Sequence, residues 1–143
     1  MHPAVESFLA KGLGLHQWLY LKTDGRVGRS LSGRPMLLLR TVGAKTGQDR
    51  VNALLYVPTG DGFTVIGSTG GGPKHPGWFH NLKAQPDVDV QVGRERIPVR
   101  ARVAEGEERE RLWAEANRVN KGGYDVYQTK TDREIPVVVL ERR

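Results

Sequence analysis

Six short apolar runs set the limits on how this 143-residue chain can fold. Runs of this kind, bounded by turns rich in glycine and aspartate such as residues 59–62, are typical of β-strands that pair locally and antiparallel. A chain with this pattern builds its core from a sheet of short strands. The expected strands span residues 36–42, 51–57, 63–68, 88–92, 97–103 and 135–140.

Two segments between these runs have a helical pattern. Residues 78–84 form a short segment that ends before Pro86, and residues 107–118 begin with Glu and end with Arg, as the helix dipole favours. The sequence contains no dinucleotide-binding glycine motif, no P-loop and no internal repeat, which argues against a doubly wound parallel sheet. We predict an α+β fold, a barrel of about six mainly antiparallel strands with flanking helices.

The first 35 residues differ from the rest of the chain. Residues 3–21 start with proline and space apolar side chains along one helical face, and residues 22–35 are rich in Gly, Lys and Arg. We therefore divide the chain into an N-terminal helix with a basic linker (1–35) and a barrel domain (36–143). The helix either packs on the barrel or lies on a membrane surface. Without a signal peptide or a membrane-spanning run we expect a cytoplasmic protein, with membrane association through this helix as an alternative.

Positive charge is concentrated in the first 85 residues, which hold ten Lys and Arg against four Asp and Glu, whereas the other residues are balanced. A basic half favours an anionic partner, such as nucleic acid, a phosphate-bearing cofactor or a lipid surface. Its basic strands lack interleaved aromatic residues and any known nucleic-acid-binding motif, so we do not expect nucleic acid to be the partner. Cysteine is absent, which excludes disulfides and thiol chemistry.

Residues 68–82 carry three consecutive glycines and, directly after them, a cluster of aromatic rings. Glycine amides can turn toward a ligand, and two prolines limit the freedom of the segment. A plain connecting loop has a similar composition. Because Trp78 and two further ring residues follow at once, we interpret the segment as a ligand-binding loop with Lys74 and His75 beside it.

The turn at residues 43–50 places Lys45, Thr46 and Arg50 on a tight glycine hairpin. Exposed N–H groups and two cations together suit a phosphate or a carboxylate, although charged hairpin turns without a ligand are common. The spacing differs from that of a P-loop.

Other candidate groups are less specific. We expect no metal site, because His75 and His80 have no cysteine and few acids near them and zinc needs three or four ligands. Ser68 has no recognisable triad around it and is expected to hydrogen-bond a ligand or the backbone. Tyr124 and Tyr127 share a face if their segment is helical, and they either pack on the barrel or cover a planar substrate.

Three motifs together resemble a known family. They are LRTVGAKTGQDRVNALLY at residues 39–56, GGGPKHPGWFHNL at 70–82 and YQTKTDREIPVV at 127–138. Over about residues 30–143 the chain resembles the deazaflavin-dependent nitroreductase family, the coenzyme F420-dependent quinone reductases of the actinobacterial type. The resemblance implies a split β-barrel, related in fold to pyridoxine-phosphate oxidases and FMN-binding reductases, with reduced coenzyme F420 as the cofactor.

The resemblance also implies roles for individual residues. The chain departs from the nitroimidazole-activating members at two positions. It has Lys130 in place of a tyrosine and Thr69 in place of a frequent lysine, and both departures argue against nitroimidazole activation. The turn at residues 43–50, here called the cation turn, would hold the phosphate and polyglutamate tail of the cofactor. The implied cofactor-binding residues are Lys45, Thr46, Arg50, Asn52, Leu54, Ser68, Thr69, Gly70, Gly71, Gly72, Lys74, His75, Pro76 and Trp78, and the candidate catalytic residues are Tyr124, Tyr127 and Ser68.

The expected activity is hydride transfer from reduced F420 to an electron-poor planar acceptor. The acceptor would be a quinone, or an α,β-unsaturated ester or lactone of the coumarin or aflatoxin kind. Two alternatives stay open: an FMN-dependent split-barrel oxidoreductase and a non-catalytic F420 carrier. The expected partner is this small molecule, and the protein is expected to be a monomer or a homodimer.

Overall fold

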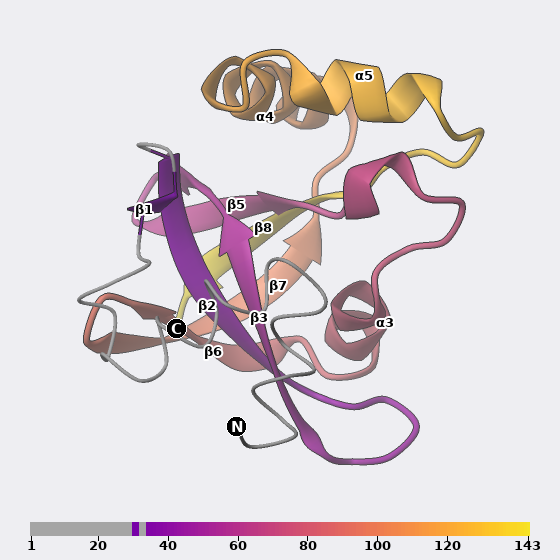
Figure 1. The fold of residues 1–143 in the computed structure, drawn as a ribbon. Helices are drawn as coiled ribbons and strands as arrows, with labels where there is room; N and C mark the ends of the chain where they lie inside the picture. The colour runs from indigo at the N-terminus through magenta and orange to yellow at the C-terminus, as the bar shows by residue number, and fades with distance from the viewer. Residues whose placement is uncertain (1–29, 32–33) are drawn as a thin grey trace, which may run out of the picture.

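The computed structural model describes residues 30–31 and 34–143, and the predicted N-terminal helix at 3–21 lies outside these residues. The described part contains an eight-stranded sheet with the strand order β1-β2-β6-β7-β8-β5-β4 (Figure 1). Strand β3 pairs with β2 outside this order, and all pairs of the sheet are antiparallel. The strands are β1 (Ser30–Leu31), β2 (Arg34–Val42), β3 (Asp49–Leu55), β4 (Val57–Thr59), β5 (Gly62–Ile66), β6 (Asp87–Val92), β7 (Glu95–Val103) and β8 (Val137–Arg142).

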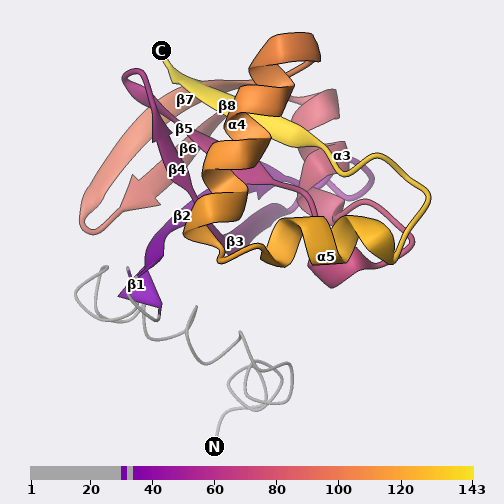
Figure 2. The same cartoon turned by 90° about the horizontal axis from the view of Figure 1, so that it is seen from above.

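Four helical segments accompany the sheet: the 3-10 turn η1 (Thr69–Gly71), α3 (Gly77–Ala84), α4 (Gly106–Val119) and α5 (Gly123–Thr129). Helices α4 and α5 pack on one side of the sheet, and α3 lies at its other end (Figures 1 and 2). None of the helices in the described residues combines the length and apolarity that crossing a membrane requires.

The alternation of side chains along β2 divides the core in two. Leu37 and Leu39 face the interior of the curled sheet, where Trp78, Phe79 and other buried side chains of α3 pack against them. Met36 and Leu38, one position out of phase, face the opposite side and pack on β3. A strand with both faces buried is apolar throughout, which explains the unbroken apolar run at the start of the barrel sequence.

A further cluster attaches α4 and α5 to the sheet. Leu112 and Ala116 of α4 and Tyr124 of α5 pack with Val137 and Val139, which lie on one face of β8. The alternate residues of β8, Val138 and Leu140, contribute to the barrel interior. Strand β8 therefore joins both halves of the core.

The structure divides one of the six predicted strands. The run at 51–57 divides at Tyr56 into β3 and β4. The Tyr56 amide still donates to the Pro35 carbonyl at 3.1 Å, in register with the β2–β3 pairs, but Pro35 has no N–H to return the bond, and Val57 pairs with Thr64 of β5 instead. The predicted basic linker at 22–35 contains the short strand β1, which pairs with the start of β2. The other predicted strands and both predicted helices are confirmed within two residues at most boundaries.

Candidate functional site

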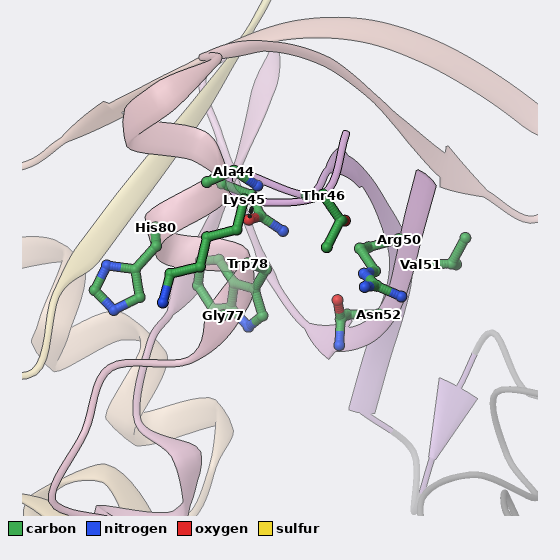
Figure 3. A pocket seen from close by; sticks show the side chains of 11 residues that line it. Ala44, Lys45, Thr46, Arg50, Val51, Asn52, Gly77, Trp78 and His80 are labelled. Atoms are coloured by element: carbon green, nitrogen blue, oxygen red, sulfur yellow. Dashed lines mark hydrogen bonds between the residues drawn. The ribbon is translucent and has the colours of Figure 1, made fainter. Parts of the chain in front are cut away.

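A cavity of about 540 Å³ opens beside the turn between β2 and β3. Figure 3 shows Lys45 and His80 on one side of it and Arg50 and Asn52 on the other, with Trp78 between them. Neither Lys45 nor Arg50 forms an ion pair with a carboxylate in the described residues, so both charges are available to an anion. The full lining is Gly43, Ala44, Lys45, Thr46, Arg50, Val51, Asn52, Gly77, Trp78, His80 and Asn81.

The conformation of this turn is set by bonds within it and by helix α3. Gly43 and Gln48 close it through an N–H···O=C bond of 2.7 Å, and Gly47 adopts a φ of +71°, which a glycine tolerates. The Ala44 amide donates to Oδ1 of Asn81 at 2.9 Å, and Nδ2 of Asn81 donates to the Thr41 hydroxyl at 3.0 Å. Asn81 thus fixes the cation turn to α3.

A second cavity, of about 570 Å³, shares Asn52, Gly77 and Trp78 with the first. Its walls are mainly apolar on the strand side, with the glycine loop and α5 opposite. The two cavities adjoin at these three residues, and we refer to them together as the elongated site, which is cationic at one end and apolar and aromatic at the other. The second cavity is lined by Met36, Asn52, Ala53, Leu54, Leu55, Ile66, Ser68, Thr69, Gly70, Pro76, Gly77, Trp78, Asn120, Tyr124 and Tyr127.

The glycine loop, residues 67–72, has an unusual backbone. Ser68 has right-handed helical angles (φ −78°, ψ −35°), and Thr69, Gly70 and Gly71 follow with φ of +44°, +63° and +84°. A right-handed residue followed by a left-handed one turns successive amides toward a common point, which is an anion-binding arrangement. The amides of Ser68, Thr69 and Gly70 donate to no backbone carbonyl within the described residues. The loop therefore has three donors for a ligand oxygen.

Thr69 is strained, because a β-branched residue rarely adopts a positive φ. Its hydroxyl donates to the Lys74 carbonyl at 3.1 Å and accepts a bond of 3.0 Å from Arg133. These two bonds stabilise the conformation that the backbone disfavours.

His75 lies behind the loop and faces away from the cavity lining. Nη1 of Arg133 contacts its Nδ1 at 2.9 Å, and because a guanidinium only donates, Nδ1 is the acceptor and the neutral ring carries its proton on Nε2. The ring packs on Phe79 with centroids 4.8 Å apart. Burial lowers the pKa of His75 below its ordinary value, and the positive charges of Arg133 and other neighbours lower it further.

Tyr124 and Tyr127 share one face of α5, as their spacing predicts, with ring centroids 6.1 Å apart. Tyr124 is buried against α4, whereas the Tyr127 hydroxyl has no hydrogen-bond partner among the described residues. Asp125, on the opposite face, accepts bonds from Trp113 (2.7 Å) and Asn117 (2.8 Å). These bonds hold α5 on α4, so that both rings stay over the second cavity.

Most predicted site residues come together here. Gly71, Gly72, Lys74 and His75 line neither cavity. Gly71 packs against α5, and Gly72 bonds the Thr69 carbonyl within the loop. Lys74 is exposed, and His75 contacts Arg133. The residues that line at least one cavity are Lys45, Thr46, Arg50, Asn52, Leu54, Ser68, Thr69, Gly70, Pro76, Trp78, Tyr124 and Tyr127.

Sequence reasoning missed two residues, Asn81 and Arg133. Both lie inside the motifs that carry the family resemblance, but neither periodicity nor charge distinguishes them, because their partners are backbone groups far away in the sequence. No group of three His, Asp or Glu side chains suited to a metal occurs in the part of the chain that the structure describes.

The comparisons agree on a family. The family model described as F420H(2)-dependent quinone reductase matches residues 13–142. An F420H(2)-dependent quinone reductase of Mycobacterium tuberculosis is 46% identical over 134 residues, which cover 92% of this chain and 90% of the relative. A solved F420-H2 dependent reductase (FDR-A) is 46% identical with a TM-score of 0.68, and covers 76% of this chain and 95% of its own.

Two further solved structures concern assembly and fold. One described as a domain-swapped dimer is 39% identical with a TM-score of 0.72, and covers 95% of this chain and 98% of its own. A Listeria innocua protein of the pyridoxamine 5′-phosphate oxidase type, 16% identical over 76% of this chain and 83% of its own, has a TM-score of 0.54 and shows the fold alone. The predicted split β-barrel is confirmed, with eight strands in place of about six.

The residues present suit the cofactor of this family. Free cations at one end match a phosphate and a carboxylate tail, and an apolar wall with loop amides at the other end matches a planar ring with carbonyl oxygens. The protein is an oxidoreductase with reduced coenzyme F420 as its cofactor. On sequence, fold and site together, this chain belongs to the F420H(2)-dependent quinone reductase family.

Proposed function

We propose that the elongated site holds reduced F420 with its anionic tail at the cation turn and its ring at the glycine loop, and that a quinone lies between the ring and α5. The observation that supports the proposal is that the two cavities adjoin, since both are lined by Asn52, Gly77 and Trp78. A single ligand with a charged tail and a planar head fits such a site better than two independent ligands do.

When bound, the cofactor supplies a hydride, and the protein provides orientation and a dry environment. Lys45 and Arg50 bind the tail, and Trp78, which is 5% exposed, limits water at the junction of the cavities. The amides of Ser68, Thr69 and Gly70 stabilise negative charge on a carbonyl oxygen in the second cavity.

Reduction of a quinone to a hydroquinone requires one hydride and one proton. Of the candidate catalytic residues, Tyr127 is the best placed to hold that proton, because its hydroxyl is free of other bonds in the described residues and its ring lines the cavity. Tyr124 is buried beneath it and supports its position. Ser68 acts as a hydrogen-bonding group on the wall that the loop forms.

A second class of acceptor shares this chemistry. α,β-Unsaturated esters and lactones of the coumarin or aflatoxin kind are planar and place negative charge on a carbonyl oxygen when they accept a hydride. The largely apolar walls of the second cavity suit them as they suit a quinone. We do not propose nitroimidazoles, because Lys130 stands where the activating members carry a tyrosine, with its Nζ 5.9 Å from the centre of the Tyr127 ring.

The test combines binding and turnover. Purified protein is titrated with F420 by fluorescence, with FMN in parallel, and oxidation of F420H2 is then followed with menadione and with coumarin as acceptors. Saturable binding of F420 together with menadione-dependent oxidation is the expected result. Binding without oxidation by either acceptor would overturn the proposed reaction, and preference for FMN would overturn the assignment of the site.

Assembly and location are separate proposals. A relative is a domain-swapped dimer, which favours the homodimer among the two states expected for this chain. Light scattering of the purified protein distinguishes a dimer from a monomer. Membrane contact through residues 3–21 stays a prediction, and co-sedimentation of the full chain with anionic vesicles tests it.

A further inference from the structure

Arg133 donates to four groups of the glycine loop, which lines the second cavity, and to the nearby His75 ring. Nη1 bonds the Gly67 carbonyl (3.0 Å), Nη2 the Ser68 carbonyl (2.7 Å) and Nε the Gly72 carbonyl (2.9 Å). The remaining two are the Thr69 hydroxyl (3.0 Å) and Nδ1 of His75 (2.9 Å). One side chain, more than 60 residues away in the sequence, thus binds both ends of the loop.

These bonds determine where the loop amides point. In a trans peptide the N–H lies antiparallel to the C=O of the preceding residue. Because the carbonyls of Gly67 and Ser68 face Arg133, the amides of Ser68 and Thr69 point away from it, and those two residues line the second cavity. A bond from a charged donor to each carbonyl also polarises the peptide unit and strengthens its N–H as a donor.

The charge of Arg133 is not neutralised by a carboxylate. No Asp or Glu of the described residues pairs with it, and the neighbouring Glu134 pairs with Arg109 at 3.0 Å instead. The five groups that accept its side-chain bonds are neutral dipoles. A partly buried cation without a counterion favours negative charge nearby, and a ligand in the cavity that Ser68 and Thr69 line can supply it.

We propose that Arg133 is the positioning residue that gives the glycine loop its anion-binding conformation and polarises the Ser68 and Thr69 amides toward a carbonyl oxygen of the bound ligands. The inference rests on the proposed function, because that function supplies the oxygen on which negative charge develops. It requires no contact between Arg133 and the ligands, since the charge acts through the two peptide units.

The experiment uses Arg133→Ala, Arg133→Lys and a control, Arg143→Ala. Arg143 also donates to backbone carbonyls, those of Val99 and Val88, but lies away from both cavities. We expect Arg133→Ala to lower kcat with menadione about 10²-fold, as loss of an oxyanion donor does, with little change in KM. Arg133→Lys is expected to recover little, because an ammonium point charge does not reach three divergent carbonyls.

Chemical rescue separates positioning from general stability. Guanidinium at about 50 mM denatures little and fits the space left by the removed side chain. It should restore part of the kcat of Arg133→Ala, with saturation, and should leave Arg143→Ala unchanged. Equal restoration of both variants, or none of Arg133→Ala, would overturn the inference.

Amide hydrogen exchange of the cofactor-free protein gives a readout that does not depend on turnover. In Arg133→Ala the amides of Gly71 and Gly72, which bond the carbonyls of Ser68 and Thr69, should exchange faster, and guanidinium should slow them. Unchanged exchange in a fully active Arg133→Ala protein would refute the role of Arg133. Wild-type protein that protects the loop but reduces no quinone would instead refute the proposed function.

Discussion

The backbone amide of Ala44 donates to Oδ1 of Asn81 at 2.9 Å, across 37 positions of the sequence. This bond attaches the cation turn to the second half of helix α3, whose first residues, Gly77 and Trp78, line both cavities. The charges of Lys45 and Arg50 are therefore held at a fixed distance from the cavity that we propose for the planar head.

Replacing Asn81 by Ala should weaken F420 binding without removing a charge. Two hydrogen bonds of about 1 kcal/mol each are lost, so Kd should rise roughly 10- to 30-fold. Titrations at low and high salt provide the check: the salt dependence of Kd should match that of the wild type, because both cations remain. A change in that dependence with no change in Kd at low salt would contradict the role given to Asn81.

Removing Lys45 and Arg50 together should have the opposite signature. Each charge-assisted bond to an anion contributes about 1.5–3 kcal/mol, so the double alanine variant should bind F420 more than about 10²-fold less tightly and with a weaker salt dependence. The matched control is Arg94→Ala with Arg96→Ala, which removes the same charge from two exposed residues, one in the turn between β6 and β7 and one at the start of β7. If both double variants lose affinity equally, net charge and not the cation turn attracts the cofactor.

Gly70 and Gly71 allow a test of the loop by neighbouring substitutions. Both have positive φ, so alanine at either position should cost about 1–2 kcal/mol. A Cβ at Gly70 meets nothing within 4 Å, whereas one at Gly71 lies 2.7 Å from the Tyr127 carbonyl. Gly71→Ala should therefore lower the free energy of unfolding by roughly 2–5 kcal/mol and displace α5. Urea titration of both variants measures the difference, and equal losses would show that α5 does not press on the loop.

His75 should make stability depend on pH. Burial first, and then the charges of Arg133, His80 and Lys83, lower its pKa in the folded state below the ordinary 6.5. Below about pH 6.5 the unfolded chain binds a proton that the folded protein disfavours, so the stability contribution is complete above that pH and is lost as the pH falls toward the lowered pKa. His75→Asn keeps an acceptor for Arg133 without titrating, and should flatten the decline below pH 6.5 in thermal unfolding.

The control for that experiment is His80→Asn, which leaves the bond between Arg133 and Nδ1 of His75 in place. Its decline with falling pH should be somewhat smaller than that of the wild type and much steeper than that of His75→Asn, because the charge of His80 lowers the pKa of His75 less than burial and Arg133 do. If the stability of His80→Asn depends as little on pH as that of His75→Asn, the group that causes the decline is not His75.

Tyr127→Phe should lower kcat with menadione about 10²-fold, the typical contribution of a positioned general acid, with a smaller effect on KM. The ring and its packing on Tyr124 are kept, so F420 affinity should hardly change. The solvent deuterium isotope effect on kcat should fall in this variant if the hydroxyl delivers the proton. A larger loss in Tyr124→Phe would reverse the roles of the two tyrosines.

The sheet was largely predictable because apolar periodicity is a local property. Residues 88–92 and 97–103 alternate apolar and polar side chains, and the structure has strands there. The break at Tyr56 was not predictable, since it depends on the missing N–H of Pro35, which lies 21 positions earlier and opposite Tyr56 only after β2 and β3 pair. Strand pairing order likewise follows from tertiary contacts.

The site was predictable in its ligand-facing residues and less so in its supports. Lys45 and Arg50 were identified because two cations on a glycine turn are visible in the sequence. The residues that hold the loops, Asn81 and Arg133, act through backbone carbonyls and amides, which carry no sequence signal. For His75 the resemblance implied a pocket residue, and the structure instead gives it a contact with Arg133, so a pocket role for it stays a prediction.

Strand β8 lies between β7 and β5 in the sheet, although it follows both in the sequence, and Arg133 lies shortly before its first residue, Val137. During synthesis the glycine loop is therefore exposed on the ribosome long before the segment that shapes it has been made. Partly folded chains that have not yet inserted β8 lack the binding conformation, and the cofactor can stabilise only the completed fold. F420 in the cell would then stabilise only molecules in which β8 has been inserted, and newly made protein should be degraded faster when F420 is absent.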